Sequence, residues 1–408
     1  MRLFLDSYGC TLNRADSEII RGVLKGNEFT DLSNAETVIL NTCAVKGVTQ
    51  ARMLSRIRDY LSLGKRVIVA GCLPKVNPKA LAQFPVSIVD TNSIEKLPEM
   101  LKKRMIITSS DHKRKLRMPF CLDDSVTGIV SISEGCLGRC SFCGTKNARG
   151  DLTSYPEKDI LERIKFLLKH GKREIYLTAQ DTGCYGADIK TDLARLLKEI
   201  LKIGGDYRLR IGMMNPKHVL KMMDELIKIY KDERVYKFIH VPVQSGSDKV
   251  IREMNRDYKT AYFERIIRKF REEIKDLAVS TDIIIGFPSE TDADFEKTAK
   301  LVERIRPDII NLSKFYPQPN TAAGEMRQLS TETVKKRSVR LSKICKKIIL
   351  EQNKKYIGRK LECIVVDKER RMARAPNFKQ VFLDKGAEGF VTATIVNASY
   401  GHLKGKMV

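Results

Sequence analysis

Short apolar runs alternate with amphipathic stretches over the first hundred residues of the chain. The amphipathic stretches have the pattern of helices, at Arg14–Lys25, Gly47–Leu63 and Ser93–Lys102. The runs between them have the length and apolar character of strands, at Arg2–Tyr8, Thr37–Asn41, Arg66–Ala70 and Val86–Val89. Strands that alternate with helices indicate a parallel sheet with both faces covered, so the pattern predicts an N-terminal α/β domain.

The middle of the chain repeats the order of strand and then helix six times. The candidate strands are Gly128–Ser133, Glu174–Thr178, Arg208–Met213, Phe238–Val243, Val279–Gly286 and Ile309–Phe315. The candidate helices include Pro156–His170, Leu193–Ile203, Pro216–Tyr230, Thr260–Ile274 and Asp292–Ile305. Such a series closes into a full or partial β/α barrel, with its active site at the C-terminal ends of the strands. A doubly wound open sheet is the alternative.

Two basic segments flank this region. Thr108–Met118 is poorly patterned and contains His112-Lys113-Arg114-Lys115, which indicates a linker. Thr331–Lys355 predicts a helix, whose lysines and arginines either contact phosphates or form an ordinary solvated face. Beyond it, a small β-barrel is predicted from short strands at Lys360–Asp367, Arg371–Ala375, Gln380–Leu383 and Phe390–Ala398. The expected divisions are 1–107, a linker at 108–125, a barrel at 126–330, a helix at 331–355 and a β-barrel at 356–408.

Charge and composition narrow the class of protein. The 408 residues carry a formal net charge of +25, with a pI near 9.6, which favours a polyanionic partner such as nucleic acid over a merely lysine-rich surface. No apolar stretch approaches the roughly 20 residues that cross a bilayer, so we expect no membrane association. Asp6 interrupts the N-terminus, which does not resemble a signal peptide, and we expect a cytoplasmic protein. Its ten cysteines are then metal ligands, reactive groups or core residues rather than disulfides.

Three cysteines lie within eight residues, directly after the first predicted barrel strand. Cys136, Cys140 and Cys143 form the pattern CxxxCxxC, and thiolates suit iron–sulfur clusters or zinc. A structural zinc site would require a fourth Cys or His nearby, and none follows at a suitable distance. Three ligands on a four-iron cluster leave one iron open to bind a substrate or cofactor. The pattern therefore predicts a catalytic iron–sulfur cluster.

A second trio is spread along the N-terminal region. Cys10, Cys43 and Cys72 each close an apolar strand and precede a candidate helix. The C-terminal ends of parallel strands share one edge, so we expect the three thiols to converge there and hold a second cluster. Buried core cysteines are the alternative. The other four, Cys121, Cys184, Cys345 and Cys363, are interpreted as structural, although Cys184 follows Asp181-Thr182-Gly183 near the barrel mouth.

The CxxxCxxC motif after the first barrel strand resembles that of the radical S-adenosylmethionine superfamily. That resemblance implies a [4Fe–4S] cluster whose open iron binds S-adenosylmethionine and whose electron cleaves it to a hydrogen-abstracting radical. The whole chain is similar to the methylthiotransferase family that includes MiaB and RimO. Motifs typical of its archaeal and eukaryotic branch are Tyr8-Gly9-Cys10-Thr11-Leu12-Asn13-Arg14-Ala15-Asp16-Ser17-Glu18, Asn41-Thr42-Cys43-Ala44-Val45-Lys46, Gly212-Met213-Met214-Asn215-Pro216 and Val241-Pro242-Val243-Gln244-Ser245-Gly246-Ser247-Asp248.

The resemblance implies an activity and its partners. That branch methylthiolates C2 of threonylcarbamoyladenosine at position 37 of tRNA, beside the anticodon. Two [4Fe–4S] clusters, S-adenosylmethionine, the tRNA anticodon stem-loop and an electron-donor protein are implied, and the sulfur donor is left open. The N-terminal trio would carry the sulfur, and the barrel trio would generate the radical. The tail resembles a TRAM domain, an RNA-binding β-barrel, although the match is loose.

Further residues are placed by the barrel motifs. Contacts to S-adenosylmethionine or substrate are expected from strand-end residues, with salt bridges and turns as the alternative, at Gln180, Asp181, Arg210, Gln244, Ser245 and Asp282. Arg149 is expected at the cofactor, at RNA or on the surface. Gly144 departs from the family pattern, which has a larger apolar residue there.

Other functions remain compatible with these motifs. The same chemistry would serve isopentenyladenosine in tRNA or an aspartate of a ribosomal protein. A non-catalytic iron–sulfur protein that binds RNA is a different class, which would neither bind nor cleave S-adenosylmethionine.

Overall fold

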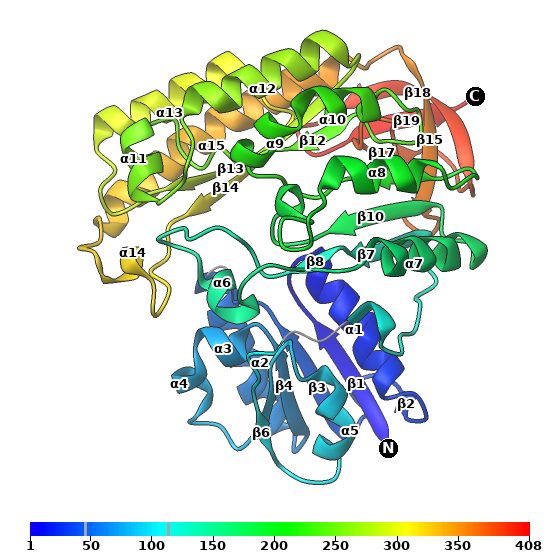
Figure 1. Ribbon diagram of the computed structural model, residues 1–408, viewed down its shortest axis with the longest axis vertical. Coiled ribbons are helices and arrows are strands. Elements are labelled where there is room, and N and C mark those ends of the chain that lie inside the picture. The colour runs from blue at the N-terminus through cyan, green and yellow to red at the C-terminus, as the bar shows by residue number, and fades with distance from the viewer. Residues whose placement is uncertain (45–46, 112–114) are drawn as a thin grey trace.

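Three parts follow one another along the chain. The computed structural model describes residues 1–44, 47–111 and 115–408; the motif residues Val45-Lys46 and His112-Lys113-Arg114 lie outside these ranges. In Figure 1 the N-terminal sheet and its helices lie at the bottom, the β/α region lies above them, and the C-terminal strands lie at the upper right. Within the described ranges, no helix is both long enough and apolar enough to cross a bilayer.

The N-terminal part is the predicted parallel sheet, and it has six strands, the four expected ones and the two-residue strands β2 and β6 at its edges. Its strand order is β2-β1-β3-β4-β5-β6, with bounds β1 (Arg2–Ser7), β2 (Glu28–Phe29), β3 (Thr37–Thr42), β4 (Arg66–Gly71), β5 (Ser87–Val89) and β6 (Ile106–Ile107). One face packs against α1 (Thr11–Val23), η1 (Ile94–Lys96) and α5 (Leu97–Met100). The other packs against α2 (Gly47–Ser62), α3 (Leu73–Val76) and α4 (Pro78–Leu81). Because both faces are covered, every residue of β3 is buried.

The middle part is a partial β/α barrel of six parallel strands. One three-stranded sheet has β7 (Thr127–Ser131), β10 (Glu174–Thr178) and β11 (Arg208–Arg210). The other has β12 (Phe238–His240), β13 (Ala278–Ile285) and β14 (Ile309–Lys314). The amide of Tyr236 donates to the carbonyl of Leu209 at 3.0 Å, which links the two sheets. The open doubly wound alternative is therefore excluded, and the fold class predicted from the sequence is confirmed.

Helices surround the barrel close to where the pattern predicts them. They are α7 (Glu157–Lys169), α8 (Leu193–Leu201), α9 (Pro216–Lys221), α10 (Met223–Tyr230), α11 (Asp248–Glu253), α12 (Thr260–Glu273), α13 (Asp292–Ile305) and α14 (Ala322–Glu325). The single helix expected at Pro216–Tyr230 is two helices, because Met222 leaves the helical conformation (φ −125°, ψ 22°). Each of the two helices has its own buried side chains, such as Val219 on α9 and Leu226 on α10.

The loop with the cysteine motif is bracketed by short elements. The short strands β8 (Ser133–Glu134) and β9 (Thr153–Ser154) pair antiparallel on either side of it. Helix α6 (Gly144–Arg149) begins directly after Cys143. In Figure 1 this helix lies against α3 of the N-terminal part, and the two helices are in contact. The motif therefore lies at the junction of the two parts.

The basic helix and the tail complete the fold. In α15 (Thr331–Lys354) the guanidinium of Arg337 binds Glu290 and Asp292, and Arg340 binds Glu296, so these arginines have structural partners. Five strands form a closed barrel in the order β15-β16-β17-β19-β18. Their bounds are β15 (Lys360–Asp367), β16 (Met372–Arg374), β17 (Gln380–Leu383), β18 (Phe390–Ala398) and β19 (Leu403–Met407).

Strand β19 was not predicted from the sequence. One of its inward-facing positions is Gly405, so the alternation of apolar and polar side chains that indicates a strand is interrupted there. A Cβ at Gly405 would lie 2.9 Å from Val381 and 3.0 Å from Ala393, so glycine is what allows the barrel to close.

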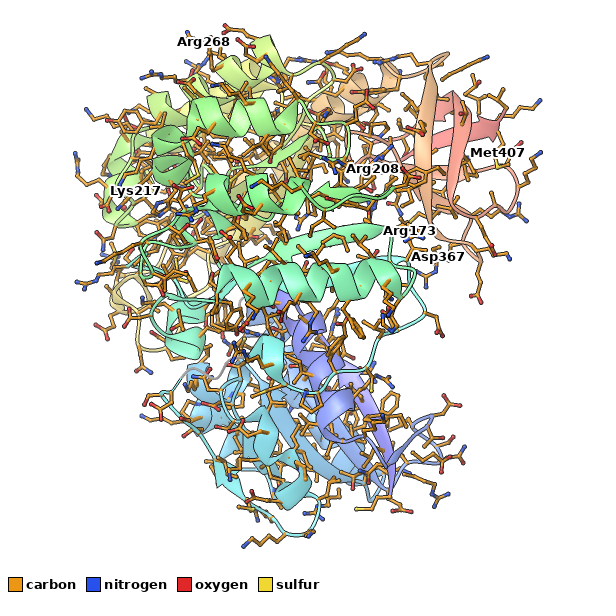
Figure 2. The ribbon with its side chains drawn as sticks, turned by 45° about the vertical axis from the view of Figure 1, so that its right-hand side comes forward. Arg173, Arg208, Lys217, Arg268, Asp367 and Met407 are labelled. Carbon is orange, nitrogen blue, oxygen red and sulfur yellow. The ribbon has the colours of Figure 1, made fainter. Side chains whose placement is uncertain are left out.

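The C-terminal barrel packs directly on the β/α barrel. The ring of Phe378 lies among the rings of Tyr176, Tyr236 and Phe238, with centroid distances of 4.7–5.6 Å. Arg208 reaches across from β11, donates to Glu362 at 2.9 Å and covers the ring of Phe390 (Figure 2). This interface combines an aromatic cluster with ion pairs, including Lys379 with Asp308 at 2.7 Å, and both fix the tail on the barrel.

Candidate active site

The N-terminal cysteines converge at one edge of the sheet. The register of β1, β3 and β4 aligns Ser7 with Asn41 and Asn41 with Ala70, so the three strands end together. A Cβ at Gly9 would lie 2.9 Å from the Cβ of Cys43, which shows how closely the first and second strand ends approach. The convergence expected for Cys10, Cys43 and Cys72 is present in the structure.

Asn13 is the residue around which this trio is arranged. Its Oδ1 lies 3.8 Å from the sulfurs of both Cys10 and Cys72. Its Nδ2 donates to the carbonyls of Tyr8 and Thr42 at 2.9 and 2.8 Å, which fixes the backbone just before Cys10 and Cys43. One side chain thus contacts all three strand ends.

The trio is shielded from solvent to different degrees. Cys43 and Cys72 are buried, and Cys10 is exposed. Burial raises the pKa of Cys72 to about 11, although the nearby Arg149 guanidinium opposes the shift. Thiolates at this place therefore need a cationic partner or a metal to be stable.

The barrel trio lies on the loop between β8 and α6. The amide of Gly138 donates to the sulfur of Cys136 at 3.2 Å, and a Cβ on Gly138 would lie within 3.6 Å of the sulfurs of Cys136 and Cys140. The Arg256 guanidinium donates to Cys140 at 3.1 Å. Burial alone lowers the pKa of Arg256, but Tyr258 and Cys140 outweigh it and hold the pKa above its usual value. A backbone amide and a guanidinium thus donate to two of the three sulfurs, those of Cys136 and Cys140.

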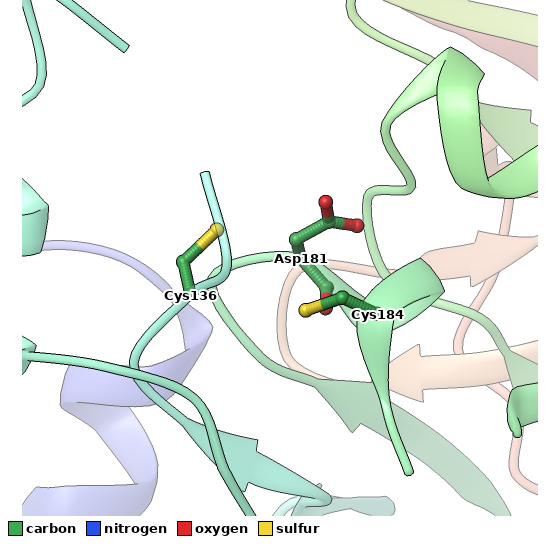
Figure 3. Close-up of side chains that lie close together, drawn as sticks. All are labelled: Cys136, Asp181 and Cys184. Atoms are coloured by element: carbon green, nitrogen blue, oxygen red, sulfur yellow. The ribbon is translucent and has the colours of Figure 1, made fainter. Parts of the chain in front are cut away.

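Cys184 lies beside this trio. The ligand atoms of Cys136, Asp181 and Cys184 lie within 4.8 Å of one another, and Figure 3 shows the three side chains close together. The hydrogen bond from Cys184 lowers the pKa of Cys136. Asp181 also accepts from the amides of Gly183 and Asn215 at 3.0 and 3.1 Å. Cys184 was interpreted from the sequence as structural. In the structure it contacts Cys136, on the loop that carries the barrel trio.

A cavity of about 370 Å³ opens next to Cys143. Gln244 and Asp282 line it, together with aromatic side chains and polar groups from β14. Asp282 accepts from His240 at 3.0 Å and from Asn311 at 2.8 Å. Burial by itself raises the pKa of Asp282, but these two partners hold it below its usual value. Gln244 has φ +67°, an uncommon conformation for a non-glycine residue that is often found at functional sites.

The N-terminal part contacts one wall of this cavity through Gln318. Gln318 lines the cavity, accepts from Gln50 at 2.9 Å and donates to the carbonyl of Ala44 at 2.9 Å. A Cβ at Gly144 would lie 3.2 Å from Gln318, so the glycine that departs from the family pattern leaves room for this contact. The cavity therefore lies where the N-terminal part and the barrel meet.

The remaining predicted contacts occupy different surroundings. The buried Oε1 of Gln180 has no hydrogen-bond partner within the described part of the chain. Ser245 is fully buried and contacts Thr298 at 3.3 Å. Arg210 lies over the rings of Tyr176, Phe238 and Phe378. Their roles at the cofactor stay predictions.

Two residues of this site were missed in the sequence. Asn13 lies three residues after Cys10, one helical turn away, and this spacing was the available signal. Arg256 lies 116 residues from Cys140, and no local pattern connects them. Arg149 is 1% exposed, so of the three places considered for it, the one on the surface is wrong.

Comparisons with known proteins agree with this geometry. The model of the Radical SAM superfamily matches residues 130–302, and that of the Uncharacterized protein family UPF0004 matches residues 2–90. The first covers the barrel and its cysteine motif, and the second covers the strand-end trio.

Solved structures show the same fold at low sequence identity. The radical S-adenosylmethionine methyltransferase TsrM of Kitasatospora setae aligns with a TM-score of 0.59 at 14% identity, covering 79% of this chain and 76% of that one. The cobalamin-dependent S-adenosylmethionine radical enzyme OxsB aligns with a TM-score of 0.54 at 13% identity, over 85% and 56% of the two chains.

Curated archaeal relatives match along the full length. A probable threonylcarbamoyladenosine tRNA methylthiotransferase of Pyrococcus horikoshii is 41% identical over 100% of both chains. Its counterpart in Archaeoglobus fulgidus is 38% identical over 100% of this chain and 99% of its own. The human threonylcarbamoyladenosine tRNA methylthiotransferase is 35% identical over 84% of this chain and 62% of its own length. The chain therefore belongs to the family of the threonylcarbamoyladenosine tRNA methylthiotransferases, within the radical S-adenosylmethionine superfamily.

Proposed function

We propose that this protein is a tRNA methylthiotransferase, which acts on C2 of threonylcarbamoyladenosine at position 37 of tRNA. The observation that carries this proposal is the pair of cysteine trios on the two sides of one domain junction, beside a barrel cavity whose wall residue Gln318 contacts the N-terminal part. The archaeal relatives that match over the full length carry this activity in their names and support the choice of substrate.

The cysteines fit two [4Fe–4S] clusters. We assign one cluster to Cys136, Cys140 and Cys143, where the Gly138 amide and the Arg256 guanidinium stabilise sulfur charge. We assign the other to Cys10, Cys43 and Cys72, whose strand ends converge on Asn13. When bound, the clusters and S-adenosylmethionine supply radical chemistry at a carbon whose hydrogen no acid or base can remove.

The cavity residues bind and orient the reactants. Asp282 is held ionised by His240 and Asn311, so it can accept hydrogen bonds from a hydroxyl or an amino group. The unpartnered Oε1 of Gln180 is suited to the amino group of S-adenosylmethionine. Phe142, Phe315 and Tyr316 line the cavity and offer flat faces to a purine. We place the extruded adenine among these rings, where they exclude water.

We propose the anticodon stem-loop as the partner and the TRAM-like C-terminal barrel as one surface that binds it. The net charge of +25 supports a polyanionic partner, and Lys404 and Lys406 are exposed on β19 of that barrel. For the domain boundaries we propose the divisions expected from the sequence, with the TRAM-like barrel at 356–408. An electron-donor protein and a cytoplasmic location complete it, since free thiols and iron–sulfur chemistry need reducing conditions.

The direct test is an anaerobic assay with reconstituted enzyme, a reductant, S-adenosylmethionine and tRNA that carries threonylcarbamoyladenosine. We expect 5′-deoxyadenosine release and a methylthiolated nucleoside by mass spectrometry. A Cys140→Ala variant serves as the control and should give neither. A parallel assay uses tRNA that carries isopentenyladenosine; if only this tRNA were modified, the proposed substrate would be wrong. Enzyme that releases no 5′-deoxyadenosine would overturn the whole proposal.

Binding is tested separately through its salt dependence. The double variant Lys404→Glu/Lys406→Glu should weaken tRNA binding and lower the slope of log K against log salt by about 1 for each phosphate that these lysines neutralise. Lys231→Glu, at the barrel surface in an ion pair with Glu273, is the matched control and should leave the slope unchanged. An equal effect of both variants would contradict a role for the C-terminal barrel.

A further inference from the structure

Four charged side chains are buried together at the junction of the two cysteine sites. Arg149 binds Asp16 at 2.6 Å and Glu134 at 2.9 Å, and Lys115 binds the same two carboxylates at 2.8 and 3.0 Å. All four residues are at most 2% exposed. The group, here called the buried quartet, is neutral overall and joins α1, the linker segment that carries Lys115, β8 and α6.

Stability alone does not account for the buried quartet. Charges lose their hydration when they are buried, and apolar side chains of similar volume often stabilise a protein equally well. What the quartet supplies is geometry, because a guanidinium has donors on a rigid, planar fork. Arg149 uses this fork in two directions, toward Glu134 with one terminal nitrogen and toward Asp16 and Asn13 with the other.

The contact with Asn13 connects the quartet to the N-terminal trio. The Nη2 of Arg149 donates to Oδ1 of Asn13 at 2.9 Å, and this is the atom that lies 3.8 Å from the sulfurs of Cys10 and Cys72. The guanidinium thus fixes which way the Asn13 amide is turned. That orientation in turn directs Nδ2 to the backbone carbonyls beside Cys10 and Cys43.

The same quartet flanks the barrel trio on both sides. Glu134 lies two residues before Cys136, and Arg149 is the last residue of α6, the helix that begins directly after Cys143. The loop that carries the three barrel cysteines is therefore closed at both ends by residues of the buried quartet. Asp16 lies one turn after Asn13 on α1, the helix that Cys10 precedes.

We propose that Arg149 is a positioning residue, which couples the two cysteine sites by orienting Asn13 while anchoring the ends of the barrel loop. This inference rests on the proposed function. Through these contacts the N-terminal trio keeps one fixed place relative to the barrel loop and the cavity. Loss of the guanidinium fork disturbs the surroundings of the N-terminal cluster and uncouples radical formation from sulfur transfer.

The test uses Arg149→Lys, which keeps the charge but removes the fork. Arg337→Lys is the matched control, since Arg337 is also buried and also binds two carboxylates, Glu290 and Asp292, far from the cysteines in sequence. The first readout is the amount of methylthiolated nucleoside per 5′-deoxyadenosine released. We expect Arg149→Lys to lower this ratio about 10-fold or more, as for residues that orient metal ligands, and Arg337→Lys to leave it unchanged.

The second readout does not depend on activity. In a Cys140→Ala background the N-terminal cluster is observed alone, by iron and sulfide analysis and by electron paramagnetic resonance of the reduced protein. Adding Arg149→Lys should alter its spectrum or lower its iron content, whereas adding Arg337→Lys should do neither.

The outcomes separate the two proposals. A Cys140→Ala reference that binds no iron overturns the proposed second cluster, and this inference with it. A reference that binds iron, with a spectrum and a product ratio that Arg149→Lys does not change, overturns the coupling role alone. Equal effects of Arg149→Lys and Arg337→Lys would mean that Arg149 only stabilises the fold.

Discussion

The two cysteine trios differ in how the chain brings them together. The barrel trio lies within eight residues on one loop. The cysteines of the N-terminal trio are spread from residue 10 to residue 72 and follow the ends of three strands. The first depends on the conformation of a single loop, and the second depends on the register of a parallel sheet. A local site tolerates changes elsewhere in the fold, whereas a site assembled by register requires the whole sheet.

Each trio has an arginine beside it, Arg256 at the barrel trio and Arg149 at the N-terminal trio. The two arginines differ in which part of the molecule they come from relative to the cysteines. Arg256 donates directly to Cys140 and belongs to the same barrel as the cysteine. Arg149 acts on the N-terminal trio from the barrel side, through its hydrogen bond to Asn13 and through the positive charge that it places beside Cys72. The barrel trio is thus self-contained, while the N-terminal trio is complete only when the two parts of the molecule are packed together.

The largest effect is expected from removing one cysteine of each trio. Cys140→Ala should abolish 5′-deoxyadenosine release, a loss of at least about 10³-fold, because the radical-forming cluster loses a ligand. Cys43→Ala should abolish methylthiolation while 5′-deoxyadenosine is still released. Each variant should retain about four of about eight iron atoms per chain, which iron analysis checks. If Cys43→Ala also stopped 5′-deoxyadenosine release, the barrel trio would not be self-contained.

The next effect concerns the guanidinium of the barrel trio. Arg256→Leu removes the donor to Cys140 and should lower the rate of 5′-deoxyadenosine release about 10- to 100-fold, as expected for a group that supports a metal ligand. The reduction potential of this cluster should become more negative, since a hydrogen bond and a positive charge at the sulfur favour the reduced state. Potentiometric titration in a Cys43→Ala background measures it. Arg252→Leu, an exposed arginine on α11, is the control.

A smaller effect is expected where the N-terminal part meets the cavity wall. A Cβ at Gly47 would lie 2.1 Å from the ring of Tyr316, which lines the cavity. Gly47→Ala should therefore displace this ring and lower methylthiolation about 10-fold, with a larger change in KM for tRNA than in kcat. Gly64→Ala, where a Cβ meets no atom within 4 Å, offers a control, although its φ of +69° adds some strain. Unchanged kinetics in Gly47→Ala would show that the junction adapts.

The smallest effect is a dependence of stability on pH at the same junction. Burial, with the nearby Asp123, raises the pKa of Glu18 on α1 to about 7 from 4.5. The neutral carboxyl therefore stabilises the fold below pH 4.5, and this contribution is lost as the pH rises through 7.

The variant Glu18→Gln keeps a neutral side chain at every pH. We expect it to unfold about 2–4 °C above the parent protein at pH 8 and at nearly the same temperature at pH 5. Anaerobic differential scanning calorimetry of both proteins at the two pH values measures the difference. A shift of equal size at pH 5 would assign the effect to packing rather than to ionisation.

Much of the fold was predictable because its signals are local. The strands at Glu174–Thr178, Lys360–Asp367, Gln380–Leu383 and Phe390–Ala398 have the predicted bounds, since each is a short apolar or alternating run between turn residues. The barrel trio was equally local. Strand β19 was missed because only a glycine fits at its inward-facing position 405. The strand therefore lacks an apolar side chain there, and its alternating pattern is not visible in the sequence.

The sequence by itself determined the order of the elements, the barrel motif and the positions of six cysteines at strand ends and on one loop. Only the tertiary structure decided that Arg149 is buried, that Asn13 lies between the thiols of Cys10 and Cys72, and that Cys184 lies beside Cys136. The physical reason is that periodicity and spacing report on neighbours along the chain. Contacts of Asn13 with Cys72 and with Arg149, which lie 59 and 136 residues away, depend on how separate layers pack, and no local pattern encodes that.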